Sequence, residues 1–306
     1  MDFSKYGYAS AQWREFLTTN PSAAQDGFSG NNPSEAIQLQ ETANQTRATA
    51  GAELLAKSGL DSKVDISTTS VPSRYQHHQI PIRRYTSKGR QGNVAERVLV
   101  YFHGGGFLFG SEATEDSLCA EIALGVGITV LSVIYSHTPQ YVHPMAHDDA
   151  LDVYDHILKN TSAYGVSLVA GLAVLGISAG ASLAAEFVQH DLKLSKTSLS
   201  HRPLVAGAVL SIPWLIHIEN VPLHLFESPE KASSVQCRDA PVIPWPRLKL
   251  FSDLLAAEDI TDPRLNAALR PDSELQGWPK TGFVIAGMDP LRDDGLIFAK
   301  RLKASG

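Results

Sequence analysis

Five short and almost continuously apolar runs constrain the fold of this 306-residue chain more than any other feature. They are VLVYF at 98–102, ITVLSVIY at 128–135, LAVLGI at 172–177, VAGAVLSI at 205–212 and FVIAG at 283–287. Each run is too apolar to leave one face in water, which is typical of parallel strands that are buried on both sides. We therefore predict a mostly parallel sheet with helices on both faces.

Amphipathic stretches between the runs predict the covering helices. Apolar residues recur at helical spacing in 115–124, 146–158 and 179–192. Ahead of the first run, VDISTTSV at 64–71 and IPIRRYTS at 80–87 are rich in β-branched residues and are followed by polar turns. The sequence therefore predicts an α/β fold that begins with two antiparallel strands.

Two segments fall outside this alternation. Residues 1–60 have helical periodicity from Ala11 and again from Ala36, whereas residues 215–275 are rich in Pro, His and charged residues. We expect 1–60 to be a helical N-terminal cap segment. We expect 61–306 to be the core domain, with an insertion at about 215–275 that forms another part of the cap.

Charge and composition argue against several classes of binding partner and cofactor. The formal net charge is −6 and the 26 Lys and Arg are scattered, so we expect no nucleic-acid partner. Cys119 and Cys237 lack metal-ligand spacing, and we expect neither a metal nor an organic cofactor. Without a signal-like start or an apolar run of bilayer length, we predict a cytoplasmic protein with no transmembrane segment. The oligomeric state cannot be predicted from these features.

The pattern GISAG at 176–180 lies where a predicted strand meets a predicted helix. Small residues around Ser178 permit a sharp turn, which lifts the hydroxyl above the carboxyl edge of the sheet. The same turn places the Ala179 amide at a helix N-terminus, where it can donate to a developing oxyanion. The pattern favours Ser178 as a nucleophile, and the alternative is a tight turn with a passive serine.

The pattern HGGGF at 103–107 directly follows the first apolar run. Glycines without side chains let backbone amides turn toward a substrate carbonyl, as an oxyanion hole requires. A flexible turn or a phosphate cradle is the alternative. No Gly-Lys-Ser/Thr sequence follows, however, and the spacing differs from a dinucleotide fingerprint, so we prefer the oxyanion hole.

Three acidic residues follow the last apolar run in DPLRDD at 289–294. A carboxylate at the carboxyl end of a late strand can orient and stabilise an imidazolium. Asp293 or Asp294 could equally be an N-cap or a first-turn charge of the next helix. Spacing alone puts Asp289 only slightly ahead of the other two.

Taken in order, HGGGF, GISAG and DPLRDDG resemble the hormone-sensitive-lipase-like branch of the α/β-hydrolases. The similarity runs from about Val64 to the end of the chain, and YSHTPQYVHPMAHDDAL at 135–151 is similar to another block of that family. The resemblance implies an α/β-hydrolase fold with a helical cap. It also implies a serine carboxylic-ester hydrolase that works through an acyl-enzyme, and the expected lid over the site fits a small hydrophobic ester better than a polymer.

The resemblance also assigns roles to individual residues. It implies Ser178 as the nucleophile, Asp289 as the orienting acid, and Gly104, Gly105 and Ala179 as the oxyanion donors. His103 then belongs to the structure of the loop and is not the base. Phe107, Trp214 and Trp245 are candidates for an apolar substrate pocket, although buried aromatic residues belong more often to a core.

The chain departs from the family in one important respect. These hydrolases run Ser, Asp and then His along the chain, and no histidine follows Asp289. We therefore expect the last strand and helix to be missing and the chain to be truncated. Smaller departures are Ile177, where the family usually has Asp or Glu, and Ala181, where it usually has Gly.

Other histidines are possible replacements for the base. They are His137, His143, His147, His190, His217 and His224. We interpret each as a surface or loop residue instead. The alternative function is therefore a ligand-binding protein of the hydrolase fold or an inactive truncated form, since a serine without an adjacent base is a poor nucleophile.

Overall fold

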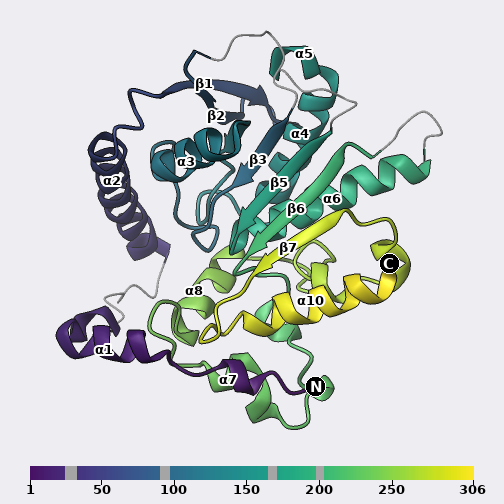
Figure 1. The fold of residues 1–306 in the computed structure, drawn as a ribbon. Helices are drawn as coiled ribbons and strands as arrows, with labels where there is room; N and C mark the ends of the chain where they lie inside the picture. The colour runs from purple at the N-terminus through teal and green to yellow at the C-terminus, as the bar shows by residue number, and fades with distance from the viewer. Residues whose placement is uncertain (25–32, 90–96, 165–170, 198–202) are drawn as a thin grey trace.

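Among the residues that the structure describes, seven strands form one central sheet (Figure 1). The computed structural model describes residues 1–24, 33–89, 97–164, 171–197 and 203–306. The strands are β1 (Val64–Pro72), β2 (Gln79–Ser87), β3 (Val98–Phe102), β4 (Thr129–Val133), β5 (Leu172–Ile177), β6 (Val205–Ser211) and β7 (Lys280–Val284). Their order across the sheet is β1-β2-β4-β3-β5-β6-β7.

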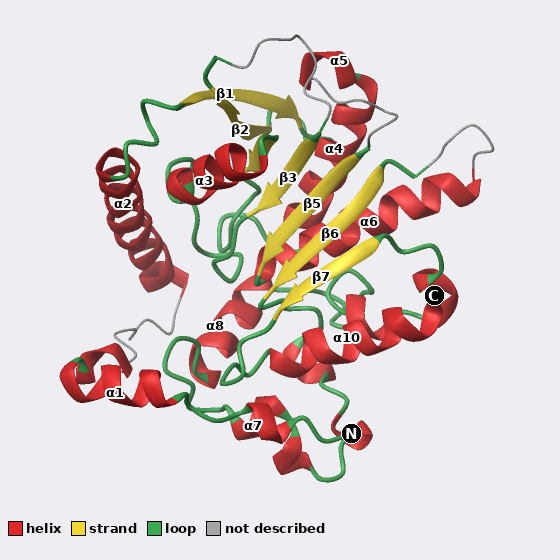
Figure 2. Cartoon of the chain, in the orientation of Figure 1, coloured by secondary structure: helices red, strands yellow, loops and turns green. Residues whose placement is uncertain are grey.

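The pairing confirms the predicted α/β class and mostly parallel sheet. Strand β2 pairs antiparallel with both β1 and β4, and every other neighbouring pair is parallel. Figure 2 shows the arrowheads of β3, β5, β6 and β7 at the same edge. The loops that follow these four strands therefore gather along that edge.

The prediction for the fifth apolar run was partly wrong. Strand β7 begins earlier than the run and ends at Val284, so Ile285, Ala286 and Gly287 lie beyond the strand. The strand is also not buried on both faces, and Val284 is 57% exposed. The physical reason is its place in the sheet, because β7 has only β6 as a neighbour among the described strands.

Strand β3 shows why the central strands are apolar along their whole length. Its side chains alternate between two core clusters, since Val98, Val100 and Phe102 belong to one and Leu99 and Tyr101 to the other. The second cluster also contains residues of α3 (Asp116–Val126), whereas the first contains residues of α4 (Met145–Lys159) and α6 (Ala179–Thr197). Both faces of the sheet are thus covered, as predicted.

The two segments that we expected to form a cap contain helices. The N-terminal segment holds η1 (Ser4–Tyr6), α1 (Ala11–Thr19), η2 (Pro21–Ala24) and α2 (Pro33–Lys57). The later segment holds η3 (Ile218–Asn220), η4 (Leu223–Leu225), η5 (Pro229–Lys231), α7 (Ser233–Gln236), α8 (Trp245–Leu255), η6 (Ala267–Leu269) and α9 (Asp272–Leu275). The remaining helices are α5 (Thr161–Tyr164) and α10 (Arg292–Ser305). Their role as a cap stays a prediction.

Contacts between distant residues join these two segments. The amino group of Met1 donates to the carbonyl of Leu225 at 2.6 Å, and the Met1 carbonyl accepts from the amide of Glu227 at 3.2 Å. The Asp2 carboxylate lies 3.0 Å from the ammonium of Lys231. The start of the chain therefore packs beside η4 and η5, near α7 in Figure 1.

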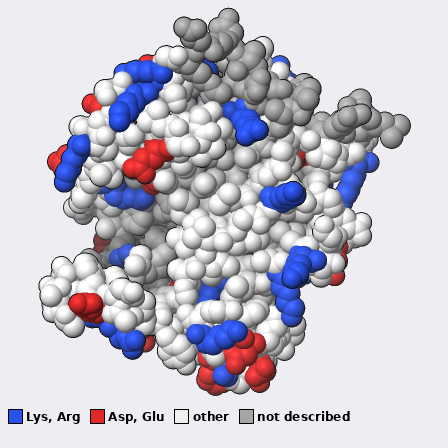
Figure 3. Space-filling model, in the orientation of Figure 1, with Lys and Arg blue, Asp and Glu red and all other residues white. Residues whose placement is uncertain are grey.

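Charged side chains of both signs are interspersed around the face shown in Figure 3. The absence of a nucleic-acid partner stays a prediction. Within the described ranges, every helix is too short or too polar to span a lipid bilayer.

Candidate active site

Ser178 occupies the turn between β5 and α6 in a strained backbone conformation. Its φ is +53°, in the left-handed region that residues with a side chain rarely adopt. The amide of Ser178 donates to the Ser211 carbonyl at 2.9 Å, and its own carbonyl accepts from the amides of Ala181 and Trp214 at 2.9 and 3.2 Å. These bonds hold the strained turn, and among the described residues the Ser178 hydroxyl has no hydrogen-bond partner.

Glycines on both sides of Ser178 allow α6 to approach the sheet closely. A side chain at Gly176 would overlap the carbonyl of Gly180, and one at Gly180 would overlap the carbonyl of Phe102. Any larger residue would force the helix away from the strands. The N-terminus of α6 consequently lies against the end of β3, where the HGGGF loop begins.

The HGGGF loop lies directly against the Ser178 turn. A side chain at Gly104 would come within 3.1 Å of the Ile177 carbonyl oxygen, and Gly105 has a φ of +140° that favours glycine. In the described part of the chain, the amides of Gly104 and Gly105 donate to no acceptor. The amide of Ala179, the first residue of α6, is also unpaired and lies at the positive end of the helix dipole. Such amides can stabilise an oxyanion.

His103 is built into this loop as a structural residue. Its ring is fully buried and stacks on Tyr135 with ring centroids 4.3 Å apart, while the Tyr135 hydroxyl donates to the His103 carbonyl at 2.8 Å. Burial lowers the pKa of His103 to about 4, so the ring is neutral near pH 7. A neutral, stacked ring supports the loop backbone and is not positioned as a base.

Asp289 lies beyond the end of β7, at the same edge of the sheet as Ser178. One carboxylate oxygen, Oδ1, accepts the amide of Leu291 at 2.8 Å, and the other oxygen has no partner among the described residues. Burial raises the pKa of Asp289 to about 6, although the Leu291 amide and the charge of Arg292 partly oppose the shift. Asp289 is therefore ionised above that pH.

The structure separates the three acids that spacing left nearly equal. Asp293 accepts the amide of Ser233 at 2.6 Å and the guanidinium of Arg292 at 2.9 Å. Asp294 accepts two buried backbone amides, both at 2.9 Å, from residues 215 and 216. Both carboxylates thus bind the 212–237 segment to α10, whereas Asp289 keeps an oxygen free for another group.

Comparison with known proteins places this fold in a family. The family model described as "alpha/beta hydrolase fold" matches residues 99–306. The chain is 30% identical to Esterase LipI of Mycobacterium tuberculosis over 68% of this chain and 60% of that protein. It is 31% identical to an ethyl acetate hydrolase of Pseudomonas putida over 79% of this chain and 70% of that protein.

The chain belongs to the α/β-hydrolase family. The match confirms the predicted resemblance to the hormone-sensitive-lipase-like branch. A hyperthermophilic esterase from the archaeon Pyrobaculum calidifontis superposes with a TM-score of 0.73 at 26% identity, over 97% of this chain and 86% of that one. The chain spans 60 to 70% of the length of the two curated relatives.

No described histidine of this α/β-hydrolase hydrogen-bonds to Ser178 or Asp289. The candidate histidines with side-chain hydrogen bonds contact other groups at 2.8 to 3.0 Å, namely His143 with Asp262, His147 with Ser182, His190 with Asp155 and His217 with Ser252. The ring of His137 packs against the rings of His103 and Tyr135, and His224 is exposed. None of them is placed as a base for Ser178.

Two of the three aromatic residues proposed for the substrate pocket lie next to each other. The rings of Phe107 and Trp214 are 5.7 Å apart, and both side chains are buried. They border a cavity of about 10 Å³, which is barely large enough for one water molecule. Trp245 begins α8, and its ring lies against the guanidinium of Arg238. A substrate-binding role for the three stays a prediction.

A larger pocket of about 170 Å³ opens beside Asp289. Its walls are apolar apart from this carboxylate and are formed by Ile212, Ala240, Pro241, Val242, Ile243, Ala286, Met288, Asp289 and Pro290. Sequence reasoning missed this pocket because its residues come from three segments that are far apart in the chain. No local pattern signals their meeting.

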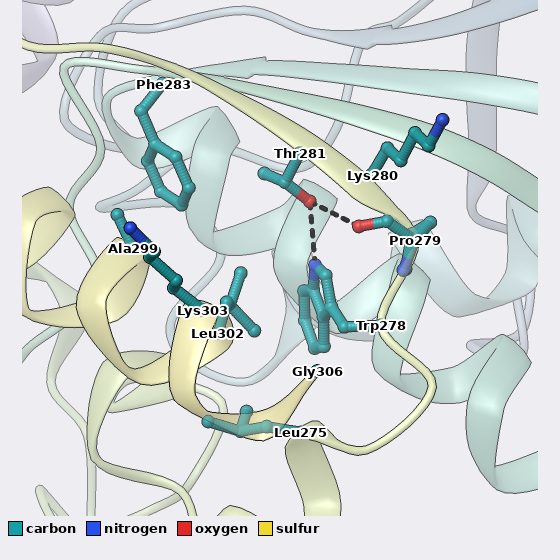
Figure 4. Close-up of a pocket in the computed structure, with 10 residues that line it drawn as sticks. All are labelled: Leu275, Trp278, Pro279, Lys280, Thr281, Phe283, Ala299, Leu302, Lys303 and Gly306. Atoms are coloured by element: carbon teal, nitrogen blue, oxygen red, sulfur yellow. Dashed lines mark hydrogen bonds between the residues drawn. The ribbon is translucent and has the colours of Figure 1, made fainter.

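Another hollow, of about 300 Å³, lies between β7 and α10 (Figure 4). Its wall includes Trp278 and Phe283, and the Thr281 hydroxyl accepts the indole N–H of Trp278 at 3.1 Å. None of its lining side chains is a carboxylate or a histidine, and it begins at Lys280, the opposite end of β7 from Asp289. We therefore do not place the chemistry there.

Metal binding finds no support in the described ranges, where no three His, Cys, Asp or Glu side chains gather. Cys119 and Cys237 are free and buried. Burial raises the pKa of both thiols, so both remain protonated near pH 7.

Proposed function

We propose that this protein is a serine carboxylic-ester hydrolase that cleaves small hydrophobic esters through an acyl-enzyme on Ser178. The observation that carries the proposal is the strained Ser178 turn, whose hydroxyl lies beside the amides of Gly104 and Gly105; none of these groups has a hydrogen-bond partner among the described residues. The esterase names of the relatives support an ester substrate, and the ethyl acetate hydrolase supports a small one.

The proposed reaction follows from these groups. The Ser178 oxygen attacks the ester carbonyl carbon, and the amides of Gly104, Gly105 and Ala179 stabilise the negative charge that develops on the carbonyl oxygen. A base takes the Ser178 proton and returns it to the leaving alcohol, and water then releases the acid from the acyl-enzyme. Asp289 orients this base and stabilises its charged form.

The proposed base is a histidine outside the residues that the structure describes, because no described histidine contacts Ser178 or Asp289. Ser178→Ala is expected to abolish hydrolysis of p-nitrophenyl butyrate. Ser182→Ala is the matched control, since the Ser182 hydroxyl is already bonded to His147 and to the Arg264 carbonyl. Undiminished hydrolysis by the Ser178→Ala enzyme would contradict the proposal.

A second candidate function is ligand binding without cleavage. It is favoured by one observation, the lack of a described histidine in contact with Ser178 or Asp289, because an unassisted serine is a weak nucleophile. A fluorophosphonate probe distinguishes the two functions in the folded 306-residue chain. Rapid labelling at Ser178 would argue against a binding protein, whereas no labelling would favour it.

A further inference from the structure

One face of helix α2 carries polar contacts to the segment that continues from the HGGGF loop. Its residues are Gln40, Asn44, Arg47 and Gly51, which lie four, three and four residues apart and therefore share one side of the helix. Arg47 forms an ion pair with Glu115 at 3.1 Å, and a side chain at Gly51 would come within 2.8 Å of the backbone carbonyl that faces it. This polar face of α2 is therefore packed closely, and α2 lies beside α3 in Figure 1.

Gln40 makes the central contacts of the polar face. Its side chain is buried, and its amide nitrogen donates to the carbonyl of Leu108 at 2.6 Å and to the carbonyl of Thr138 at 2.9 Å. Its amide oxygen accepts the side-chain amide of Gln140 at 2.7 Å. Both N–H groups and the oxygen of this amide are thus paired. A single side chain of α2 joins the loop after β3 to the loop after β4.

Other hydrogen bonds attach residues 103–110, which we call the oxyanion loop. The amide of Thr138 donates to the carbonyl of Phe107 at 2.8 Å, and the amide of Gly110 donates to the side-chain oxygen of Asn44 at 2.9 Å. Phe107 has a φ of +60°, which is strained for a residue with a side chain. Strained backbone persists only where its surroundings hold it. The conformation of the oxyanion loop therefore depends on groups outside the loop.

The contact at Leu108 reaches the unpaired amides through a closed turn. The carbonyl of Gly105 accepts the amides of Leu108 and Phe109 at 3.0 and 2.9 Å, so these residues form one hydrogen-bonded unit. Within the described ranges the amides of Gly104 and Gly105 have no acceptor of their own. Their direction is consequently set by the turn, and Gln40 holds the turn from α2.

We propose that the polar face of α2, with Gln40 at its centre, holds the amides of Gly104 and Gly105 in the direction that binds an oxyanion. Gln40 and Asn44 are then positioning residues, because they act through the backbone of the oxyanion loop. This inference rests on the proposed hydrolase function. It adds that α2 must be packed against the oxyanion loop for the oxyanion hole to form.

Hydrogen exchange tests the contact without reference to activity. Gln40→Met keeps an unbranched side chain of similar length but has no N–H, so the carbonyls of Leu108 and Thr138 lose a donor. We expect exchange in the oxyanion loop to become at least about tenfold faster, with the central strands unchanged. Gln38→Met is the matched control, because Gln38 is exposed on α2 and its side chain has no hydrogen bond among the described residues. Unchanged exchange in the loop of the folded Gln40→Met chain would overturn the proposal.

Steady-state kinetics test the positioning role. For p-nitrophenyl butyrate, Gln40→Met should lower kcat at least about tenfold and change KM less than about threefold, because an oxyanion hole acts mainly on the charge that develops in the transition state. Asn44→Leu removes the acceptor of the Gly110 amide and should also lower kcat. Asn44→Asp retains an acceptor oxygen and should recover most of that loss. A rise in KM with kcat unchanged in Gln40→Met would show a role in substrate binding instead and would contradict the proposal.

The two measurements separate this inference from the hydrolase function itself. If the unaltered chain neither hydrolyses the ester nor reacts at Ser178 with a fluorophosphonate, the hydrolase function is wrong, and so is the catalytic role of α2. Hydrogen exchange then still decides whether α2 holds the loop. If the unaltered chain is active and Gln40→Met exchanges faster in the loop with kcat unchanged, the hydrolase function stands and the positioning role is wrong.

Discussion

At the scale of single residues, the two proposed catalytic groups differ in what fixes their properties, which is backbone conformation for one and burial for the other. Ser178 is held by its backbone, because its φ of +53° is maintained by backbone hydrogen bonds with Ser211, Ala181 and Trp214. Asp289 is tuned by its surroundings, since burial in an apolar pocket raises its pKa. The GISAG pattern predicts the first feature, whereas the second depends on a pocket formed by distant segments and could not be predicted.

The raised pKa of Asp289 makes stability depend on pH. The pKa rises from 3.8 to about 6 on folding, so the folded state binds the proton more tightly and loses stability as pH increases from about 4 to 6. The full cost above pH 6 is about 3 kcal/mol. Asp289→Asn removes this cost but leaves an unpaired amide, and we expect it to increase the free energy of unfolding at pH 8 by about 1 to 2 kcal/mol.

Urea denaturation at pH 8 and pH 4 checks this prediction. The gain from Asp289→Asn should disappear at pH 4, where the carboxyl is protonated in the folded state. Asp65→Asn is the control, because Asp65 is exposed on β1 and should give the same difference at both pH values. If Asp289→Asn instead lowers the free energy of unfolding at pH 8, the prediction is wrong.

At the scale of elements, the beginning of α10 anchors the segment between β6 and α7. The guanidinium of Arg292 is fully buried and donates to Asp293 and to Gln236, while Asp294 accepts the amides of Leu215 and Ile216. From the sequence, a helix after Asp289 is considered only as the alternative setting for Asp293 or Asp294. The sequence could not predict which acid would bind the insertion, since that depends on which backbone amides approach from far along the chain.

Removing the Asp294 carboxylate should therefore lower the free energy of unfolding strongly. Asp294→Ala leaves the buried amides of Leu215 and Ile216 without an acceptor, and we expect a loss of about 3 kcal/mol in the free energy of unfolding. Asp294→Asn retains an acceptor oxygen and should lose less. Glu258→Ala, at an exposed position after α8, is the control and should change stability by less than about 0.5 kcal/mol. If Asp294→Ala lowers the free energy of unfolding no more than the control does, this prediction is wrong.

At the scale of the whole molecule, the sheet could be predicted best where both of its faces are buried. The apolar runs give the bounds of β3 and β5 to the residue, because every side chain there contacts a core. They fail at β7, where only one neighbouring strand is present among the described residues and exposed positions interrupt the pattern. The junction of Met1 with Leu225 also has no local signal, since it depends on long-range packing.

Among the described strands β7 pairs with β6 alone, and its other edge affects how the molecule behaves in solution. An exposed strand edge with apolar side chains is a template for pairing with another chain, and charged residues at such edges oppose this pairing. Val284 is 57% exposed on that edge, and Lys280 at the other end of the strand already provides one charge.

We expect Val284→Lys to reduce self-association, because a second charge opposes contact between copies while little buried apolar surface is lost. Light scattering at increasing protein concentration measures the effect, with Val126→Lys as the matched control, since Val126 is 64% exposed on α3, away from the edge. If both variants lower self-association equally, net charge and not the edge of β7 governs it.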